Sequence, residues 1–194
     1  APSAAYTDSV LARANAIYDK PVAEIAERMN PGTSGTLGNF IADAFRVVGK
    51  GDVGLMNSGG VRAPLYPGWV TLGKLFEVEP FGNSLMRVHV RGRDLRRLFE
   101  DMVDTSDVRM HLSGVKVTYD PARPAGQRIT SLTFSDGRPV NPRQLYTLVT
   151  LDFILMGGDG LSLAKHATKV DDLKMIDLDA LERYVRSRPQ PVRA

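Results

Sequence analysis

Apolar side chains recur at helical spacing in five stretches of the chain. The clearest begins at Leu37 and repeats at i+3, i+4, i+7, i+8 and i+11 up to Val48, and Gly49 follows as a signal for the helix end. We expect the apolar face of this helix to be buried. Weaker patterns predict four more helices: one before Pro21 with Asp8 or Ser9 as N-cap, Leu72 to Phe76 behind Thr71, Leu95 to Val103, and a last one capped by Asp177 or Asp179.

Short apolar runs and alternating patterns predict strands between these helices. They cover residues 53–56, 69–70, 86–90, 115–119, 129–134 and 145–151. Val22 to Glu27 fits either a strand or a helical turn, and its periodicity leaves both open. Asp136-Gly137 is typical of a hairpin turn, while residues 30–36 and 80–83 are expected to be loops. The order of helices and strands indicates an α+β layered domain.

Composition narrows the class of protein. With 194 residues and 43% apolar side chains, the chain has room for one domain with a sizeable core. The absence of cysteine excludes disulfides, thiolate metal sites and cysteine nucleophiles. A net charge of +3 would help an anionic substrate to arrive, but the chain lacks the aromatic-interleaved basic stripe expected of a nucleic-acid-binding domain. We also expect no membrane span, since no apolar run approaches the roughly 18 residues required.

Two glycine-containing stretches carry the candidate chemistry. Asn57 and Arg62 bracket Ser58-Gly59-Gly60, which follows a short apolar strand. In the second stretch, Phe153 follows an apolar strand and precedes Gly157-Gly158 and Asp159. Glycines let the backbone approach a ligand closely, and amide, guanidinium and carboxylate groups can converge on its oxygen atoms. The pair predicts a site for a flat, hydroxylated molecule.

Five motifs in this order resemble the C-terminal domain of the family of 5′-nucleotidases, UDP-sugar hydrolases and 2′,3′-cyclic-nucleotide phosphodiesterases. The motifs are Leu37 to Ala44, Asn57 to Arg62, Pro80 to Asn83, Ser113-Gly114, and Phe153 with Gly157 to Gly160. The resemblance covers about Pro21 to Ser187 and implies a four-layer α/β/β/α fold. It also implies that residues 1–20 are a linker helix from a missing N-terminal metallophosphoesterase domain, that residues 21–194 form the substrate-binding domain, and that the protein is periplasmic or secreted.

The resemblance assigns roles to individual residues. Phe81 and Phe153 match two aromatic rings that stack on the base, and Asp159 matches a carboxylate that accepts hydrogen bonds from the ribose. Asn57 and Asn83 match amides of the nucleoside pocket. Gly114 matches a glycine that lets the backbone come close, and Arg62 matches an arginine facing the phosphate.

The same resemblance places the catalytic metals elsewhere. His89, His111 and His166 are scattered and form no metal-binding motif, so we expect this chain to bind no cofactor and the isolated chain to be inactive. Divalent ions (Mn, Zn, Mg or Co) would lie in the missing N-terminal domain. Ser58 lacks the G-x-S-x-G pattern of a serine hydrolase.

Some features depart from the family or permit a simpler interpretation. The loop at residues 30–36 lacks the arginine that many nucleotidases place there, and Arg28 has the wrong spacing to replace it. A stand-alone nucleotide-binding module without a catalytic partner is therefore the alternative. A sulfur-oxidation hydrolase branch shares the architecture but is not expected to keep both phenylalanines. Without the family, Phe81 and Phe153 would be interpreted as core residues, and Asp159 as a turn former.

Overall fold

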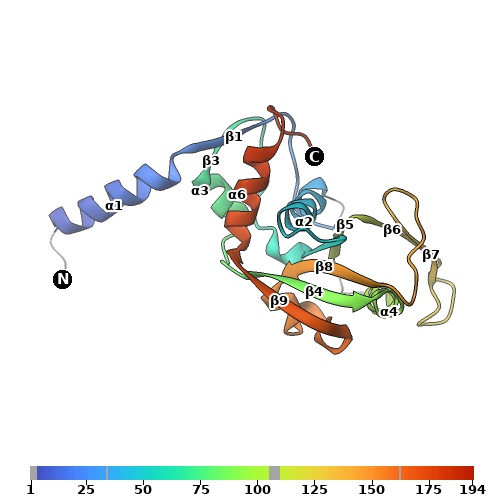
Figure 1. The fold of residues 1–194 in the computed structure, drawn as a ribbon. Coiled ribbons are helices and arrows are strands. Elements are labelled where there is room, and N and C mark those ends of the chain that lie inside the picture. Colours follow the sequence, from blue (N-terminus) through green and yellow to red (C-terminus); the bar gives the residue numbers. More distant parts are fainter. Residues whose placement is uncertain (1–3, 34, 105–109, 162) are drawn as a thin grey trace.

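The computed structural model describes residues 4–33, 35–104, 110–161 and 163–194. Its centre is a five-stranded mixed sheet with the order β5-β2-β8-β4-β9 (Figure 1). In this sheet β2 runs parallel to β8, and the other neighbours are antiparallel. The strands are β2 (Val53–Asn57), β4 (Ser84–Arg91), β5 (Met110–Ser113), β8 (Leu145–Leu151) and β9 (Ala167–Ile176).

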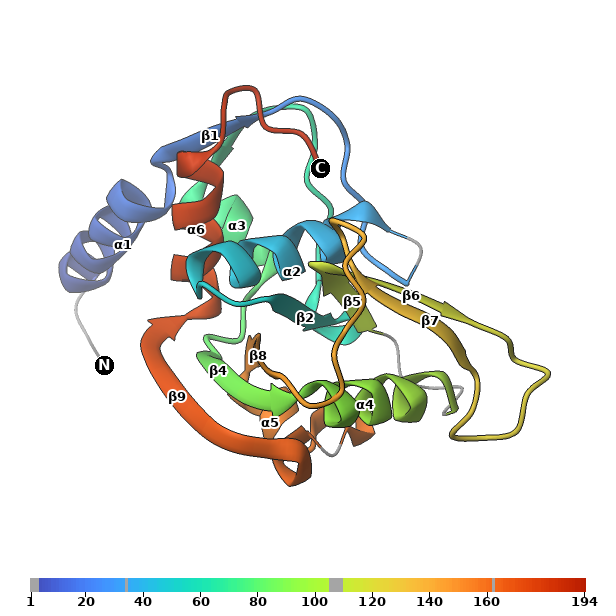
Figure 2. The ribbon, with the colours of Figure 1, turned by 45° about the vertical axis from the view of Figure 1, so that its right-hand side comes forward.

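Helices cover both faces of the central sheet. Helices α2 (Thr36–Val48) and α6 (Asp177–Ser187) lie on one face, and α4 (Gly92–Asp104) and the short α5 (Asp152–Leu155) lie on the other (Figure 2). Because β2 is covered on both sides, all five of its residues are buried. The apolar face predicted for α2 is buried as well, at Leu37, Phe40, Ile41, Ala44 and Phe45. The predicted α+β fold class is confirmed.

The remaining elements lie around this body. Helix α1 (Ala4–Tyr18) projects away from it, and two-stranded ribbons pair β1 (Pro21–Ile25) with β3 (Gly68–Thr71) and β6 (Val115–Tyr119) with β7 (Ile129–Phe134) (Figure 1). Helix α3 (Leu72–Val78) begins as predicted at Thr71, whose side chain accepts a hydrogen bond from Lys74 N. The described residues also include short 3₁₀ turns: η1 (Ser58–Gly60), η2 (Gly158–Gly160) and η3 (Leu163–His166).

Several sequence predictions need correction at element ends. Helix α1 already begins at Ala4, so neither Asp8 nor Ser9 caps it. The N-cap of α6 is Ile176, and Asp177 is the first residue of the helix. Residues 21–25 form strand β1, so the helical alternative was wrong. The Asp136-Gly137 turn joins no two named strands, since it only returns the chain to a single bridge between Thr133 and Pro139.

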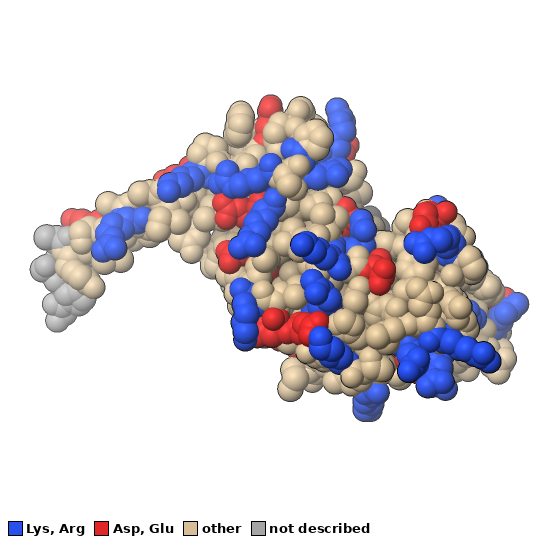
Figure 3. Space-filling view, viewed as in Figure 1, with Lys and Arg blue, Asp and Glu red and all other residues tan. Residues whose placement is uncertain are grey.

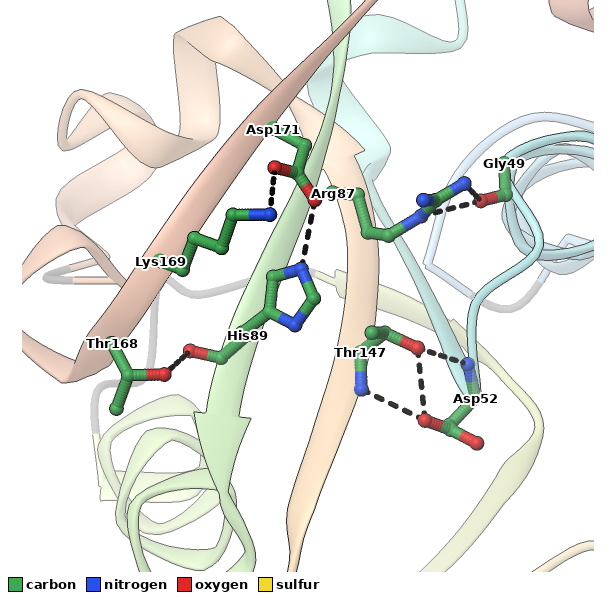
Figure 4. Close-up of polar contacts among 8 residues, drawn as sticks. All are labelled: Gly49, Asp52, Arg87, His89, Thr147, Thr168, Lys169 and Asp171. Atoms are coloured by element: carbon green, nitrogen blue, oxygen red, sulfur yellow. Dashed lines mark hydrogen bonds and ion pairs between the residues drawn. The ribbon is translucent and has the colours of Figure 1, made fainter.

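The sequence did not indicate the edge strand β9. From Val170 to Ile176 its side chains alternate between exposed and half-buried positions, because only one neighbouring strand and one face cover it. Polar contacts tie it to β4: His89 Nε2 lies 2.8 Å from Asp171 Oδ2, and Thr168 Oγ1 donates a 2.9 Å hydrogen bond to His89 O (Figure 4). Within β9, Lys169 Nζ lies 2.7 Å from Asp171 Oδ1. An edge strand rich in lysine and aspartate discourages pairing with other chains, but for the same reason its sequence gives a weak strand signal.

Candidate functional site

A cavity of about 180 Å³ lies at one edge of the central sheet. Five of the seven predicted site residues line it, together with the two glycines of η1. The lining residues are Asn57, Gly59, Gly60, Phe81, Asn83, Phe153 and Asp159.

Strand directions explain why these distant segments meet. Strands β2 and β8 are parallel, so the turn η1 after β2 and the α5–η2 segment after β8 leave the same edge of the sheet. Strand β4 is antiparallel to β8, so the loop with Phe81 and Asn83 that precedes β4 reaches this edge too. The cavity is therefore formed where one strand begins and two end.

Both phenylalanines are presented to solvent at the cavity. Phe81 is 54% exposed and Phe153 is 45% exposed, so the interpretation of both as core residues was wrong. A Cβ atom at Gly158 would lie 2.5 Å from the Phe153 ring, which shows that the ring packs against bare backbone. Exposed aromatic rings beside a cavity offer an apolar surface for a flat ligand.

Asn57 and Asp159 form the polar side of the cavity. Asn57 Nδ2 donates a hydrogen bond of 2.7 Å to Asp159 Oδ2, and Asn57 Oδ1 is buried without a hydrogen-bond partner among the described residues. Asp159 has a φ of 52°, a left-handed conformation that non-glycine residues adopt at some energetic cost. A carboxylate accepts several hydrogen bonds, so Asp159 can hold Asn57 and still accept from a ligand hydroxyl.

Two aspartates outside the cavity hold its walls, and the sequence did not reveal this role. Asp177 Oδ2 accepts hydrogen bonds from Asn83 N at 2.9 Å and Asn83 Nδ2 at 3.3 Å, and burial raises the pKa of Asp177. Asp152 Oδ1 accepts from the backbone N–H groups of Ser84 and Phe153. Asp177 thus fixes the backbone at Asn83, two residues after Phe81, and Asp152 fixes the backbone at Ser84 and at Phe153.

A third acidic residue near this wall has unusual surroundings. Glu79 is fully buried, and neither of its carboxyl oxygens finds a hydrogen-bond partner in the described part of the chain. Burial, with a smaller contribution from the negative charge of Asp177, raises the pKa of Glu79 to about 9. Glu79 is therefore protonated and uncharged at neutral pH.

The remaining predicted residues lie outside the cavity lining. Arg62 is exposed and donates a 3.1 Å hydrogen bond to Gly59 O, so it stands at the border of η1. Gly114 lines a second groove of about 550 Å³, and a Cβ atom there would lie 2.2 Å from Asp52 O. The guanidinium of Arg28 lies 5.1 Å from the ring centre of Tyr66. Ligand contacts of Arg62 and Gly114 stay predictions.

The described residues include neither a metal-binding cluster nor a helix that could span a membrane. Across residues 4–33, 35–104, 110–161 and 163–194, no group of three or more His, Cys, Asp or Glu side chains is placed to hold a metal ion. None of the described helices combines the length and apolar character that crossing a membrane requires. Figure 3 shows lysines and arginines dispersed over one face, with acidic side chains among them.

Comparisons with known proteins point to one family. The sequence profile described as "5′-nucleotidase, C-terminal domain" matches residues 10–166. Endonuclease YhcR of Bacillus subtilis is 32% identical over 190 residues, covering 92% of this chain and 15% of that protein. An apyrase of Tabanus yao is 30% identical over 148 residues, covering 69% of this chain and 27% of the apyrase.

Solved structures agree with the sequence comparisons. A 5′-nucleotidase precursor from Thermus thermophilus superposes with a TM-score of 0.78 at 26% identity, over 96% of this chain and 41% of that one. The chain thus spans less than half the length of each of these three proteins.

Proposed function

The chain belongs to the family of 5′-nucleotidase C-terminal domains, and on this premise we propose that it recognises the nucleoside part of a nucleotide for a metal-dependent phosphohydrolase. One observation carries the proposal: a single cavity brings together two exposed phenylalanines, two asparagines and an aspartate from three separate segments. This combination offers both a stacking surface and hydrogen-bonding groups, which is what a nucleoside requires.

The base is the part of the ligand that fits the cavity. The cavity has a volume of about 180 Å³, which is smaller than the roughly 300–1,000 Å³ of pockets that enclose drug-sized ligands. We therefore place the flat base against Phe81 and Phe153, with the sugar and phosphate outside. Stacking of a base on an aromatic side chain contributes about 1–3 kcal/mol and tolerates different bases.

Polar groups at the cavity mouth suit the rest of a nucleotide. Asp159 would accept hydrogen bonds from ribose hydroxyls, and Asn57 and Asn83 would contact the nucleoside. Arg62 lies beyond the glycines of η1, where its guanidinium can reach a phosphate. Asp177 supports this arrangement because it fixes the backbone and side chain of Asn83.

Hydrolysis would depend on groups outside the described residues. These residues do not fit a metal ion, so we assign the divalent metals of the family (Mn, Zn, Mg or Co) to a separate N-terminal metallophosphoesterase domain. Residues 1–20 would link the two domains, and the isolated chain would not hydrolyse nucleotides. A periplasmic or secreted location accords with relatives described as a cell wall protein and as snake venom 5′-nucleotidases.

Calorimetric titration with adenosine and AMP tests the proposal. We expect the unmodified chain to bind, and Phe81→Ala or Phe153→Ala to weaken binding by roughly 5- to 160-fold each, the loss of one stacking contact. Phe76→Ala is the matched control, because Phe76 is also an exposed phenylalanine but lies on α3 outside the cavity. Undiminished binding by the variant that carries both Phe81→Ala and Phe153→Ala, or no binding by the unmodified chain, would refute the proposal. Turnover of AMP with manganese by the isolated chain would refute its expected inactivity.

A further inference from the structure

Three polar side chains beside the cavity form a hydrogen-bonded chain that the proposed function leaves unused. Ser58 Oγ lies 3.0 Å from His111 Nε2, and His111 Nδ1 lies 3.3 Å from Asn39 Oδ1. The three residues come from η1, β5 and the first turn of α2, so they connect segments that are distant in sequence. We refer to them as the Ser58–His111–Asn39 relay.

The fold reserves space for the imidazole ring of this relay. His111 is only 2% exposed and lies opposite Met56 in the β2–β5 pairing. A Cβ atom at Gly38 of α2 would lie 2.1 Å from His111 Cδ2. Glycine within a helix is less favourable than alanine, because its backbone loses more conformational freedom. The contact with His111 gives Gly38 a physical reason to be present.

Hydrogen-bonding rules fix the direction of each bond in the relay. Burial lowers the pKa of His111, which favours the neutral imidazole. The amide oxygen of Asn39 can only accept, so Nδ1 carries the ring proton and Nε2 accepts from the hydroxyl of Ser58. When His111 is protonated, Nε2 carries a proton and can no longer accept a hydrogen bond from Ser58. The Ser58 hydroxyl must then turn so that its oxygen accepts from Nε2.

The relay restrains the cavity wall formed by Asn57 and η1, where few other side chains form hydrogen bonds. In η1, Ser58 is followed by Gly59 and Gly60, which line the cavity and carry no side chain. Glycine residues have wide conformational freedom, so a bond from Ser58 to a buried ring restrains the whole turn. Asn57, directly before Ser58, also lines the cavity.

We propose that His111 is a positioning residue for the nucleoside cavity, which through Ser58 holds the wall from Asn57 to Gly60 in its binding orientation. This inference rests on the proposed function. The charged residues on α2, β2, β5 and η1 are Asp43 and Arg46, which pair with each other at 2.6 Å. From η2, Asp159 reaches this wall through its bond to Asn57. His111 is therefore the titrating group of the relay itself.

Adenosine binding measured between about pH 5 and pH 8 tests the inference, because adenosine has no phosphate to titrate in this range. We expect the unmodified chain to bind with constant affinity near neutral pH and more weakly once His111 is protonated. Ser58→Ala should weaken binding by roughly 5-fold at neutral pH, the effect of one lost hydrogen bond, and flatten the pH dependence. Ser131→Ala, at an exposed position on β7, should leave the curve unchanged.

Two further variants separate positioning from a merely structural role. Asn39→Asp places a carboxylate beside His111 Nδ1, which should raise the pKa of His111 and move the midpoint of the binding curve upward by about one pH unit. Asn39 is exposed in the first turn of α2, where an acidic residue is tolerated. His111→Gln can still hydrogen-bond Ser58 but does not titrate, so it should bind adenosine near neutral pH with no pH dependence.

The outcomes distinguish this inference from the proposed function. If the unmodified chain binds adenosine while Ser58→Ala keeps the same affinity and pH curve, the inference fails and the function stands. A midpoint left unmoved by Asn39→Asp would likewise overturn it. If the unmodified chain binds no adenosine at any pH, the proposed function fails and the inference falls with it. Thermal melts of each variant verify that it is folded.

Discussion

Asp43 is a half-buried carboxylic acid and Glu79 a fully buried one, and their pKa values move in opposite directions. Asp43, on α2, accepts hydrogen bonds from Arg46 and Ser113 at 2.6 Å and from the hydroxyl of Tyr184. Burial alone would raise the pKa of Asp43, but the hydrogen bonds from Ser113, Tyr184 and Arg46 outweigh it and hold that pKa below its ordinary value.

Glu79 shows what happens without such donors. Its carboxyl group is completely buried, and its oxygens have no hydrogen-bond partner among the described residues. The neighbouring Asp177 accepts hydrogen bonds from the backbone N–H groups of Asn83 and Leu178. Its negative charge also disfavours the ionised form of Glu79. Asp43 is also less deeply buried than Glu79, with 31% of its side chain exposed, so hydrogen-bond donors and depth of burial together decide which of the two acids is charged.

The two sites also differ in their relation to the cavity. Asp43 lines the second groove, whereas Glu79 precedes the segment that carries Phe81 and Asn83 into the nucleoside cavity. The less satisfied carboxyl group thus lies next to the candidate functional site. Local departures from optimal stability at functional positions are common in proteins.

Replacing Glu79 should give the largest effect, and in the stabilising direction. The pKa of Glu79 is raised from 4.5 to about 9 on folding, so its contribution to stability is complete below about pH 4.5 and is lost as pH rises toward 9. At pH 7 folding must protonate Glu79, which costs about 3 kcal/mol. We expect Glu79→Gln to raise the free energy of unfolding by about that amount at pH 7, measured by urea denaturation.

The pH dependence and a neighbouring residue provide the controls. Near pH 4 the unmodified chain and Glu79→Gln should be almost equally stable, and the gap should widen up to about pH 9. Glu77→Gln changes an exposed glutamate of α3, two residues before Glu79, that pairs with Lys74, and should alter stability by no more than about 0.5 kcal/mol. A destabilised Glu79→Gln would mean that Glu79 is ionised and satisfied, and the contrast with Asp43 would disappear.

Replacing Asp43 should have the opposite sign and a smaller size. Asp43→Asn removes the charge that Arg46, Ser113 and Tyr184 share, and losing hydrogen bonds to a charged group should cost about 2 kcal/mol at pH 7. Because the pKa of Asp43 is lowered on folding, the contribution of Asp43 to stability is present above pH 3.8 and is lost as the pH falls through the lowered pKa. The difference between the two proteins should therefore shrink below about pH 4.

Asp136→Asn serves as the comparison for Asp43. Asp136 also pairs with an arginine, Arg138 at 2.8 Å, but on the exposed turn after β7. Its replacement should cause a clearly smaller loss of stability, since water can replace the exposed contacts. Equal losses in the two variants would show that the partners of Asp43 add no more than a surface ion pair does.

The sequence predicted the core elements well because their signal is local. The apolar spacing of α2 and the uninterrupted apolar residues of β2 determine which faces are buried, and both are confirmed. The short β5 and the charged edge strand β9 were missed. Their pairing depends on partners more than 50 residues away, such as His111 with Met56, and this information is absent from any local window.

The candidate site was predicted in outline for a different reason. Asn57, Phe153 and Asp159 were indicated by the two glycine-containing stretches, and the resemblance added Phe81 and Asn83. The structure brings all five to one cavity. Asp177 was interpreted only as a helix cap, while its bonds reach Asn83 across 94 positions. Side chains that support a site through long-range hydrogen bonds carry no pattern in the sequence, and neither Glu79 nor the relay could be recognised there.

The smallest effect is expected for Tyr184→Phe, which removes a single donor to Asp43. Burial and then the neighbouring Asp43 raise the pKa of Tyr184 to about 12, so the hydroxyl remains a neutral donor near neutral pH. The variant should lose about 1 kcal/mol of unfolding free energy, because Arg46 and Ser113 still satisfy Asp43. Its ring can keep the edge contact with Phe40, with a 5.2 Å centroid separation.

A double-mutant cycle makes this last prediction specific to the shared carboxylate. If the Tyr184 hydroxyl acts through Asp43, combining Tyr184→Phe with Asp43→Asn should cost less than the sum of the two single changes. Tyr66→Phe, at a tyrosine that is 56% exposed and stacked under Arg28, should leave stability nearly unchanged. Strict additivity in the cycle would mean that the hydroxyl stabilises the fold independently of Asp43, so the donors around that carboxylate would not act as a set.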